Sequence, residues 1–215
     1  VVIGCGARHD RMKHAPAIAR KFRNAARQAS ALTGPHLPGG FFLTDPSRVE
    51  DVRAIIGALP EGIGVIIRHF GQADAIETAH LIVSDCKKAR RLVLIAADPA
   101  LARATGANGM HWPFRLRQKI RKSRSGEAMI QTLSVHSTAE LRMARHCPVD
   151  ACLYSTVFQS DSPSAGSPMG LNRFAIAASQ SPKPLYALGG ITHDNAESIA
   201  RFGGFASVSA FEDLA

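Results

Sequence analysis

The chain has few aromatic side chains: only 6% of its 215 residues are Phe, Trp or Tyr, with one Trp and two Tyr. Proteins that stack nucleic-acid bases need such rings, so a base-stacking function is disfavoured. The sequence also lacks an apolar run of the roughly 20 residues that a transmembrane helix requires, and it shows no secretory signal pattern. We therefore expect a cytoplasmic protein without a membrane partner.

The sequence also lacks the spacings that mark metal and dithiol sites. None of its cysteines has CxxC spacing, so they are interpreted as reduced thiols. Its histidines and aspartates show no metal-ligand spacing either. These residues predict no metal site and no cofactor. The cysteines are Cys5, Cys86, Cys147 and Cys152.

Acidic residues are missing from one strongly basic segment. Residues 115–124 hold six Lys and Arg, and residues 1–39 hold seven with a single Asp, so each segment carries a net charge of +6. The net charge of the whole chain is only +9, so the rest is slightly acidic. Basic clusters of this kind bind nucleic acid or form solvated helix faces. Because aromatic residues are scarce, we favour solvated helix faces and expect no nucleic-acid partner.

Short apolar runs alternate with helical patterns from residue 40 onward. Continuous apolar runs are typical of strands buried on both faces of a parallel sheet, and the alternation predicts βα units. Eight strands with helices between them favour an α/β fold closed into a (β/α)₈ TIM barrel. The main alternative is an open doubly wound sheet, but no GxGxxG follows the first strand. The expected strands are 41–44, 63–67, 91–96, 109–112, 128–135, 151–158, 185–188 and 205–208, and the expected helices are 49–59, 74–88, 99–105, 115–122, 138–146, 171–179 and 195–202.

A basic extension precedes the first expected strand. Residues 16–32 have the Ala- and Arg-rich pattern of a single helix, and a linker rich in Gly and Pro follows at 33–40. We therefore divide the chain into an N-terminal extension, 1–39, and a barrel, 40–215. We expect the helix to pack outside the barrel, with the N-terminal mouth as one candidate location.

Two strand ends near the C-terminus carry the strongest functional pattern. Gly189 and Gly190 follow the seventh expected strand, and Val208 and Ser209 lie at the end of the eighth. Glycines let a phosphate approach the backbone closely, and the helix start that follows Gly190 offers unpaired N–H groups. TIM barrels commonly bind phosphate after strands seven and eight. The pattern therefore predicts a small phosphorylated ligand.

Polar residues at other strand ends complete the candidate site, because such barrels place their catalytic groups there. His136 follows the fifth expected strand and is the candidate for proton transfer, since histidine titrates near neutral pH. Its alternative role is a neighbour of a helix cap. Arg68 can pair with an anionic ligand or with a carboxylate at the barrel mouth. Asp98, His111 and Thr156 are further candidates for substrate binding.

The order of these strand-end motifs resembles that of the thiamine-phosphate synthase and TenI superfamily, over residues 40–215. The resemblance implies a TIM barrel of thiamine biosynthesis whose ligand is a thiazole phosphate. It also implies that Gly189, Gly190, Val208 and Ser209 hold the phosphate through backbone N–H groups. The matching segments are Phe42-Leu-Thr-Asp45, Val65-Ile-Ile-Arg68, Gly106-Ala-Asn-Gly-Met-His111, Ser134-Val-His-Ser137, residues 150–158, Leu188-Gly-Gly-Ile191 and residues 204–210.

The chain departs from the synthase branch at positions that serve magnesium and pyrophosphate there. Phe70 stands where that branch has a lysine, and Trp112-Pro-Phe-Arg115 lacks its second aspartate. The loop 159–169, interpreted as an active-site lid or a plain surface loop, lacks the branch's Thr-rich, Lys-containing pattern. Asp98 and Arg68 alone could hardly neutralise a departing pyrophosphate. Magnesium is therefore expected only if the chain is a synthase.

The TenI branch resembles this chain more closely, because its active-site histidine lies in a Ser-Val-His-Ser segment like Ser134-Val-His-Ser137. TenI is a thiazole tautomerase that works without metal. The resemblance implies that His136 moves a proton on a thiazole carboxylate phosphate. Two alternatives stay open: a divergent synthase that condenses aminopyrimidine pyrophosphate with thiazole phosphate, and a non-catalytic ligand-binding or regulatory barrel. The sequence also leaves a homo-oligomer open.

Overall fold

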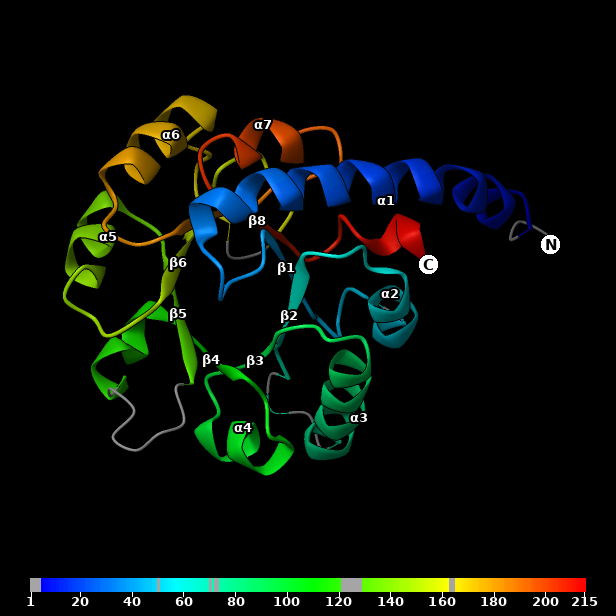
Figure 1. Ribbon diagram of the computed structural model, residues 1–215, viewed down its shortest axis with the longest axis horizontal. Helices are drawn as coiled ribbons and strands as arrows, with labels where there is room; N and C mark the ends of the chain where they lie inside the picture. Colours follow the sequence, from blue (N-terminus) through cyan, green and yellow to red (C-terminus); the bar gives the residue numbers. More distant parts are fainter. Residues whose placement is uncertain (1–4, 50, 70, 72–73, 121–128, 163–164) are drawn as a thin grey trace.

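A closed barrel of eight parallel strands forms the centre of the protein (Figure 1). The computed structural model describes residues 5–49, 51–69, 71, 74–120, 129–162 and 165–215, with the backbone alone for 5–13. The strands follow one another around the barrel in chain order, and β8 closes it by pairing with β1. The predicted TIM barrel is confirmed. The strands are β1 (Gly40–Leu43), β2 (Ile63–Ile67), β3 (Val93–Ala96), β4 (Gly109–Trp112), β5 (Ile130–Val135), β6 (Ala151–Ser155), β7 (Leu185–Leu188) and β8 (Gly204–Ser207).

Helices connect the strands and cover the outside of the barrel (Figure 1). Several begin where the sequence offers a capping side chain: carboxylates of Asp51 and Asp98 accept the N–H groups of Ala54 and Leu101, each at 2.9 Å. Such caps satisfy N–H groups that the first helical turn leaves unpaired. The connecting helices are α2 (Val52–Ala58), α3 (Ala75–Lys88), α4 (Pro99–Thr105), α5 (Thr138–Ala144), α6 (Leu171–Gln180) and α7 (Ala196–Ala200).

The connection between β4 and β5 differs from the expected helix over 115–122. The structure has a 3₁₀ helix, η1 (Phe114–Lys119), and positions 121 and 122 lie outside the described residues. A 3₁₀ helix aligns side chains three residues apart. Accordingly, the guanidinium of Arg117 lies over the Phe114 ring at 4.5 Å from its centroid.

Strand β6 is shorter than the expected 151–158 and ends at Ser155. Beyond that point the carbonyl oxygens of Thr156 and Val157 accept hydrogen bonds from Met169 and Gly170, at 3.0 and 2.8 Å. These donors belong to the chain that returns toward α6. The end of β6 is therefore tied to its own following loop, which brings that loop over the C-terminal mouth.

Alternating side chains of the strands form two apolar layers. One lies between the strands and the helices, and the other fills the barrel. Inside the barrel, the rings of Phe41 and Tyr186 lie 5.1 Å apart, and the Tyr186 hydroxyl donates to the Pro38 carbonyl oxygen at 2.5 Å. The inner layer consists of Phe41, Leu43, Ile66, Leu94, Ala151, Leu153, Tyr186 and Ala206.

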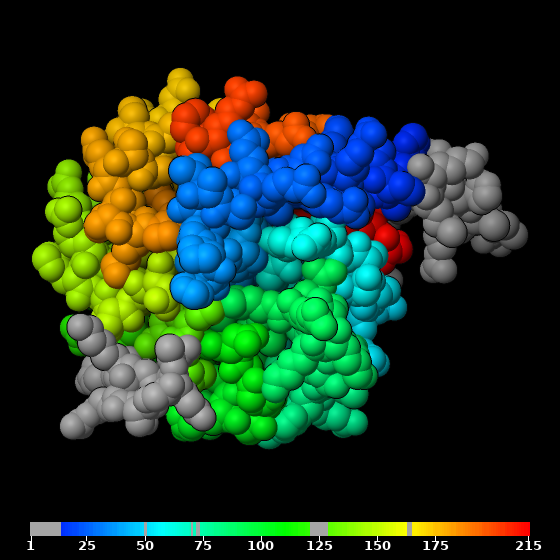
Figure 2. All heavy atoms as spheres, viewed as in Figure 1, coloured from blue at the N-terminus to red at the C-terminus, as the bar shows by residue number. Residues whose placement is uncertain are grey.

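The N-terminal helix α1 (Cys5–Thr33) packs along the outside of β8 and beside α7 (Figures 1 and 2). Phe22 is fully buried there, with ring centroids 5.9 Å from Phe205 and 4.6 Å from Phe211. Among the described residues, only a 3₁₀ helix, η2 (Glu212–Leu214), follows β8. Helix α1 therefore covers the side of the barrel that a helix after β8 would cover.

The end of α1 reaches the N-terminal rim of the barrel. A Cβ at Gly39 would lie 2.0 Å from the Ala26 carbonyl oxygen, so the start of β1 fits against α1 only because it is preceded by glycine. An exposed ion pair between Lys21 and Asp194, at 2.6 Å, joins α1 to the turn before α7. No helix within the described residues is both long and apolar enough to cross a bilayer.

Candidate active site

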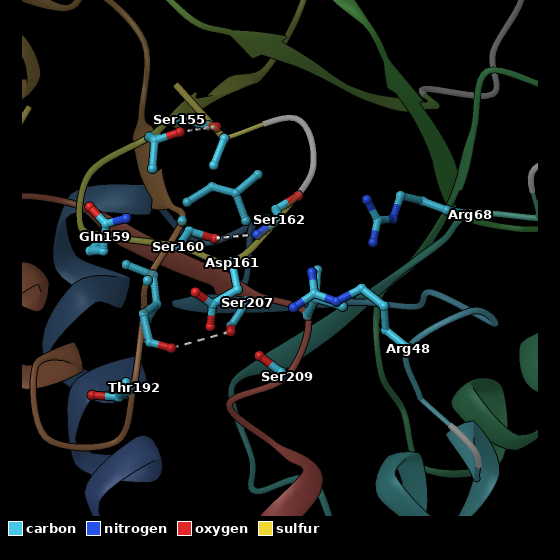
Figure 3. Close-up of a pocket in the computed structure, with 17 residues that line it drawn as sticks. Arg48, Arg68, Ser155, Gln159, Ser160, Asp161, Ser162, Thr192, Ser207 and Ser209 are labelled. Carbon is cyan, nitrogen blue, oxygen red and sulfur yellow. Dashed lines mark hydrogen bonds between the residues drawn. The ribbon is translucent and has the colours of Figure 1, made fainter. Parts of the chain in front are cut away.

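A cavity of about 260 Å³ opens at the C-terminal mouth of the barrel (Figure 3). Its walls come from the ends of β6, β7 and β8 and from the loops that follow β1, β2 and β6. The structure brings most of the nominated residues together here. Those that line the cavity are Arg68, Thr156, Gly189, Gly190, Val208 and Ser209.

The two glycines after β7 have backbone conformations that side chains rarely adopt, with φ of +95° at Gly189 and +64° at Gly190. A Cβ at Gly190 would lie 2.2 Å from the Gln159 carbonyl oxygen, and a Cβ at Gly189 would lie 2.7 Å from the Thr156 side chain. The loop after β6 therefore packs directly on the bare backbone. Only glycine fits at either position.

Backbone N–H groups at the ends of β7 and β8 border the cavity. Those of Gly190, Ile191 and Ser209 donate to no acceptor among the described residues, so they are available to an anion. The Asn195 side chain fixes this backbone: its Nδ2 donates to the Gly190 carbonyl and its Oδ1 accepts from Thr192 N–H, both at 2.9 Å. We call these three N–H groups the N–H cradle.

Helix α7 contributes less to this cradle than the sequence indicates. It contains five residues, Ala196–Ala200, instead of the expected 195–202. The N–H of Ala196 already donates to the Thr192 carbonyl oxygen at 3.1 Å. The free donors of the cavity therefore come from the strand ends, and not from the start of the helix.

Arg68 follows β2 and is held on both sides of its guanidinium. Its Nη2 donates to the Asp45 carboxylate at 3.1 Å and its Nε to the Thr44 carbonyl at 2.8 Å. Burial lowers the pKa of Arg68, the Asp45 charge opposes that shift, and the nearby charge of Arg48 adds to it. The sequence alternatives for Arg68 were a ligand anion or a carboxylate; the structure shows the carboxylate pair at the edge of the cavity.

Arg48 also lines the cavity, although no sequence pattern indicates a functional role for it. The rule for barrel mouths points to residues directly at strand ends, whereas Arg48 lies five residues beyond the end of β1 at Leu43. A turn brings it back, because the Arg48 N–H donates to the Asp45 carbonyl at 3.0 Å. A charged residue inside a loop gives no periodic signal, so only the folded loop identifies it.

His111 is buried inside the barrel below the mouth and does not line the cavity. Its Nδ1 and Nε2 each lie 2.8 Å from a hydroxyl, of Thr132 and Ser134 respectively, on the neighbouring strand. Burial lowers the pKa of His111 to about 3, with smaller contributions from the charges of Arg68 and His136. The ring is therefore neutral at ordinary pH.

Asp98 serves as the N-cap of α4 and lies outside the cavity. Its second carboxylate oxygen lies 3.5 Å from Nε2 of His69. The other ring nitrogen of His69 accepts the Gly71 N–H at 3.1 Å, so a neutral His69 carries its proton on the nitrogen that faces Asp98. This pair borders the mouth between β2 and β3.

His136 follows β5 directly, and its side chain is exposed. Its backbone N–H donates to the Glu140 carboxylate at 2.7 Å, while the Ser137 hydroxyl accepts the Glu140 N–H at 3.1 Å. This reciprocal arrangement resembles a capping box and fixes the backbone of the segment. The imidazole takes no part in the cap. It lies outside the lining of the cavity, but close enough to act on the pKa of His111.

The donor set does not suit a magnesium ion. Within the described part of the chain, no group of three or more His, Cys, Asp or Glu side chains is placed to hold a metal. One oxygen of Asp98 already accepts a backbone N–H, and Trp112 and Pro113 at the end of β4 offer no carboxylate. No reaction step through magnesium follows from these residues.

Residues 41–211 match the family model for thiamine monophosphate synthase. The chain belongs to this family. A thiamine-phosphate synthase of Hydrogenobaculum sp. is 29% identical over 186 residues, covering 81% of this chain and 87% of that protein. A putative thiamine-phosphate synthase 2 of Aquifex aeolicus is 29% identical over 127 residues, covering 58% of this chain and 68% of that protein. The resemblance seen in the sequence is thus confirmed, and the family is one of thiamine biosynthesis.

The fold of the family agrees with the observed barrel. The solved structure of a thiamine phosphate pyrophosphorylase from Pyrococcus furiosus superposes with a TM-score of 0.65 at 19% identity. The similarity covers 81% of this chain and 92% of that one. At this identity the match supports the architecture, whereas the chemistry has to be argued from the residues at the mouth.

Proposed function

We propose that the protein binds a thiazole phosphate at the C-terminal mouth and isomerises a thiazole carboxylate phosphate to its aromatic tautomer. The observation that carries the proposal is the N–H cradle of Gly190, Ile191 and Ser209 at a cavity whose glycines exclude side chains. Backbone N–H groups without an acceptor beside a cavity suit a phosphate group. The Ser134-Val-His-Ser segment at the end of β5 supplies the proton carrier, His136.

The reaction needs only proton movement. A neutral His136 imidazole takes one proton from a ring carbon of the ligand, and a proton returns to another ring atom, so the product is an isomer and no other reactant is consumed. The α5 cap holds the backbone of His136, which keeps the ring near the mouth. Binding of the phosphate in the cradle would orient the thiazole toward that ring.

The first test is a calorimetric titration of the metal-free protein with thiazole carboxylate phosphate. We expect saturable binding, whereas no binding at millimolar ligand would refute the phosphate site. The variant His136→Ala should still bind and should lose about 10²- to 10⁴-fold in kcat. His146→Ala is the matched control, because this exposed histidine lies beyond the C-terminal end of α5. An unchanged kcat in His136→Ala would remove His136 from the reaction.

A divergent synthase is the second candidate. The thiamine-phosphate synthases among its relatives favour it, as do two arginines at the cavity, because guanidinium groups suit a pyrophosphate. This candidate predicts magnesium-dependent release of pyrophosphate from aminopyrimidine pyrophosphate and thiazole phosphate. A lack of release under these conditions excludes it. Binding of thiazole phosphate without either reaction would instead identify a non-catalytic ligand-binding barrel.

A further inference from the structure

Among the described residues, three charged side chains line the cavity: Arg48, Arg68 and Asp161. Their charges are not equally compensated. Arg68 forms an ion pair with Asp45 at 3.1 Å, and its Nε donates to a carbonyl. Arg48, by contrast, has neither a hydrogen bond from its guanidinium nor an ion pair with any side chain in the described ranges. Arg48 is therefore the arginine of the cavity that has no direct counter-ion, since no ion pair joins it to the Asp161 carboxylate within the described residues.

The backbone of Arg48 is fixed although its guanidinium has no partner. Its own N–H and that of Val49 donate to the Asp45 carbonyl, at 3.0 and 2.9 Å. The Asp45 carboxylate accepts the Ser47 hydroxyl at 2.6 Å and the Ser47 N–H at 3.1 Å. This compact turn after β1 directs the half-buried Arg48 side chain across the mouth toward Ser207 and Ser209 (Figure 3).

Two guanidinium groups at one cavity repel each other. Burial is the main cause of the lowered pKa of Arg68, and the charge of Arg48 is a smaller cause in the same direction. The two guanidinium groups are therefore close enough to act on each other. An anion bound between Arg48 and the end of β8 would offset this repulsion. The N–H cradle on the opposite wall offers hydrogen bonds but no net charge, so a phosphate dianion held there gains a counter-charge only from a side chain.

We propose that Arg48 is the cationic member of the phosphate site and binds the phosphate from the side opposite the N–H cradle. This inference rests on the proposed function, and it names the residue that selects a phosphorylated ligand over its uncharged alcohol. Arginine suits this position better than lysine, because its planar fork can donate two hydrogen bonds to one phosphate.

The test is a set of calorimetric titrations with thiazole phosphate and with the dephosphorylated thiazole alcohol. Arg48→Ala should weaken binding of thiazole phosphate by about 10- to 100-fold and leave binding of the alcohol unchanged. The affinity of Arg48→Lys for thiazole phosphate should lie between those of Arg48→Ala and the wild type. Arg53→Ala is the matched control, since this exposed arginine on α2 pairs with Asp85 at 2.7 Å and does not line the cavity. It should bind as the wild type does.

The outcomes separate this inference from the proposed function. If the wild type fails to bind thiazole phosphate, the proposed function fails. If the wild type binds and Arg48→Ala binds equally well, the phosphate site stands and the role of Arg48 is overturned. An equal loss of affinity for the phosphate and for the alcohol would also overturn it. Removing a charge contact with the phosphate cannot weaken the binding of a ligand that has no phosphate. Thermal unfolding of each variant verifies that it is folded.

Discussion

Nε2 of His111 and Oγ of Ser134 lie 2.8 Å apart inside the barrel, and Nδ1 of the same ring lies 2.8 Å from the Thr132 hydroxyl. The Thr132 hydroxyl donates to the Met110 carbonyl at 3.5 Å, which leaves its oxygen to accept the His111 N–H. Nε2 then accepts the Ser134 proton. This pattern requires a neutral imidazole with one donor and one acceptor. Ser134 is half-buried.

The buried ring of His111 predicts a loss of stability in acid. Its pKa is about 3 in the folded protein, whereas an unfolded histidine titrates near 6.5. Between these values the unfolded chain binds the extra proton, so the free energy of unfolding falls as the pH falls. We expect a contribution of up to about 1.4 kcal/mol per pH unit below about pH 6, and none above about pH 7.5. Urea unfolding at a series of pH values measures it.

Two variants isolate the contribution of His111. Glutamine in His111→Gln has a donor and an acceptor but does not titrate. The pH dependence of its free energy of unfolding should therefore be smaller in acid, by the uptake of about one proton on unfolding. His80→Gln is the control, because His80 is exposed on α3 and should retain the wild-type slope. An identical slope in all three proteins would show that His111 does not cause the acid loss.

Gly190 combines a left-handed backbone with a close contact, so Gly190→Ala should disrupt the site. Its φ is +64°, and the new Cβ would lie 2.2 Å from the Gln159 carbonyl oxygen. We expect a loss of about 2 kcal/mol or more in the free energy of unfolding and loss of phosphate-ligand binding. Gly166→Ala, in the same loop system with nothing within 4 Å, should change neither. Equal behaviour of the two variants would refute the cradle geometry.

The barrel itself could be predicted from the sequence because its signal is repeated. Each buried strand is a short apolar run, and most strands lie within two residues of their expected bounds. The exceptions depend on contacts that the sequence does not show. Strand β6 ends early because Thr156 bonds to its own returning loop, and the segment after Trp112 forms a 3₁₀ helix instead of an α-helix.

The candidate site could be predicted only in part, for a physical reason. Glycines and polar residues at strand ends follow the rule for barrel mouths, and Gly189, Gly190 and Ser209 do line one cavity. The rule does not reveal which way a side chain points. It nominated His111, whose side chain points into the barrel from β4. It missed Arg48, which the turn after β1 brings back to the mouth.

The pair of Arg68 and Asp45 should contribute more to stability than the pair of Arg53 and Asp85. The Arg68 and Asp45 side chains are only 24% and 11% exposed, compared with 56% and 24% for the second pair. Asp45→Asn keeps an acceptor for Ser47 but leaves a partly buried guanidinium without its counter-charge. We expect a loss of about 1–3 kcal/mol for Asp45→Asn and below about 1 kcal/mol for Asp85→Asn. Urea unfolding compares them, and a larger loss for Asp85→Asn would contradict the ranking.

Helix α1 should be part of the barrel's cooperative unit, because its apolar face packs on β8. Phe22 is fully buried between Phe205 and Phe211, and Phe22→Ala would leave a cavity there. We expect this change to lower the free energy of unfolding by about 3–5 kcal/mol. Arg23→Ala changes the exposed neighbour and should cost within about 0.5 kcal/mol. Urea titration measures the free energy of unfolding of the barrel in both variants. If it were the same in both, residues 1–39 would be an independent extension and α1 would not stabilise the barrel.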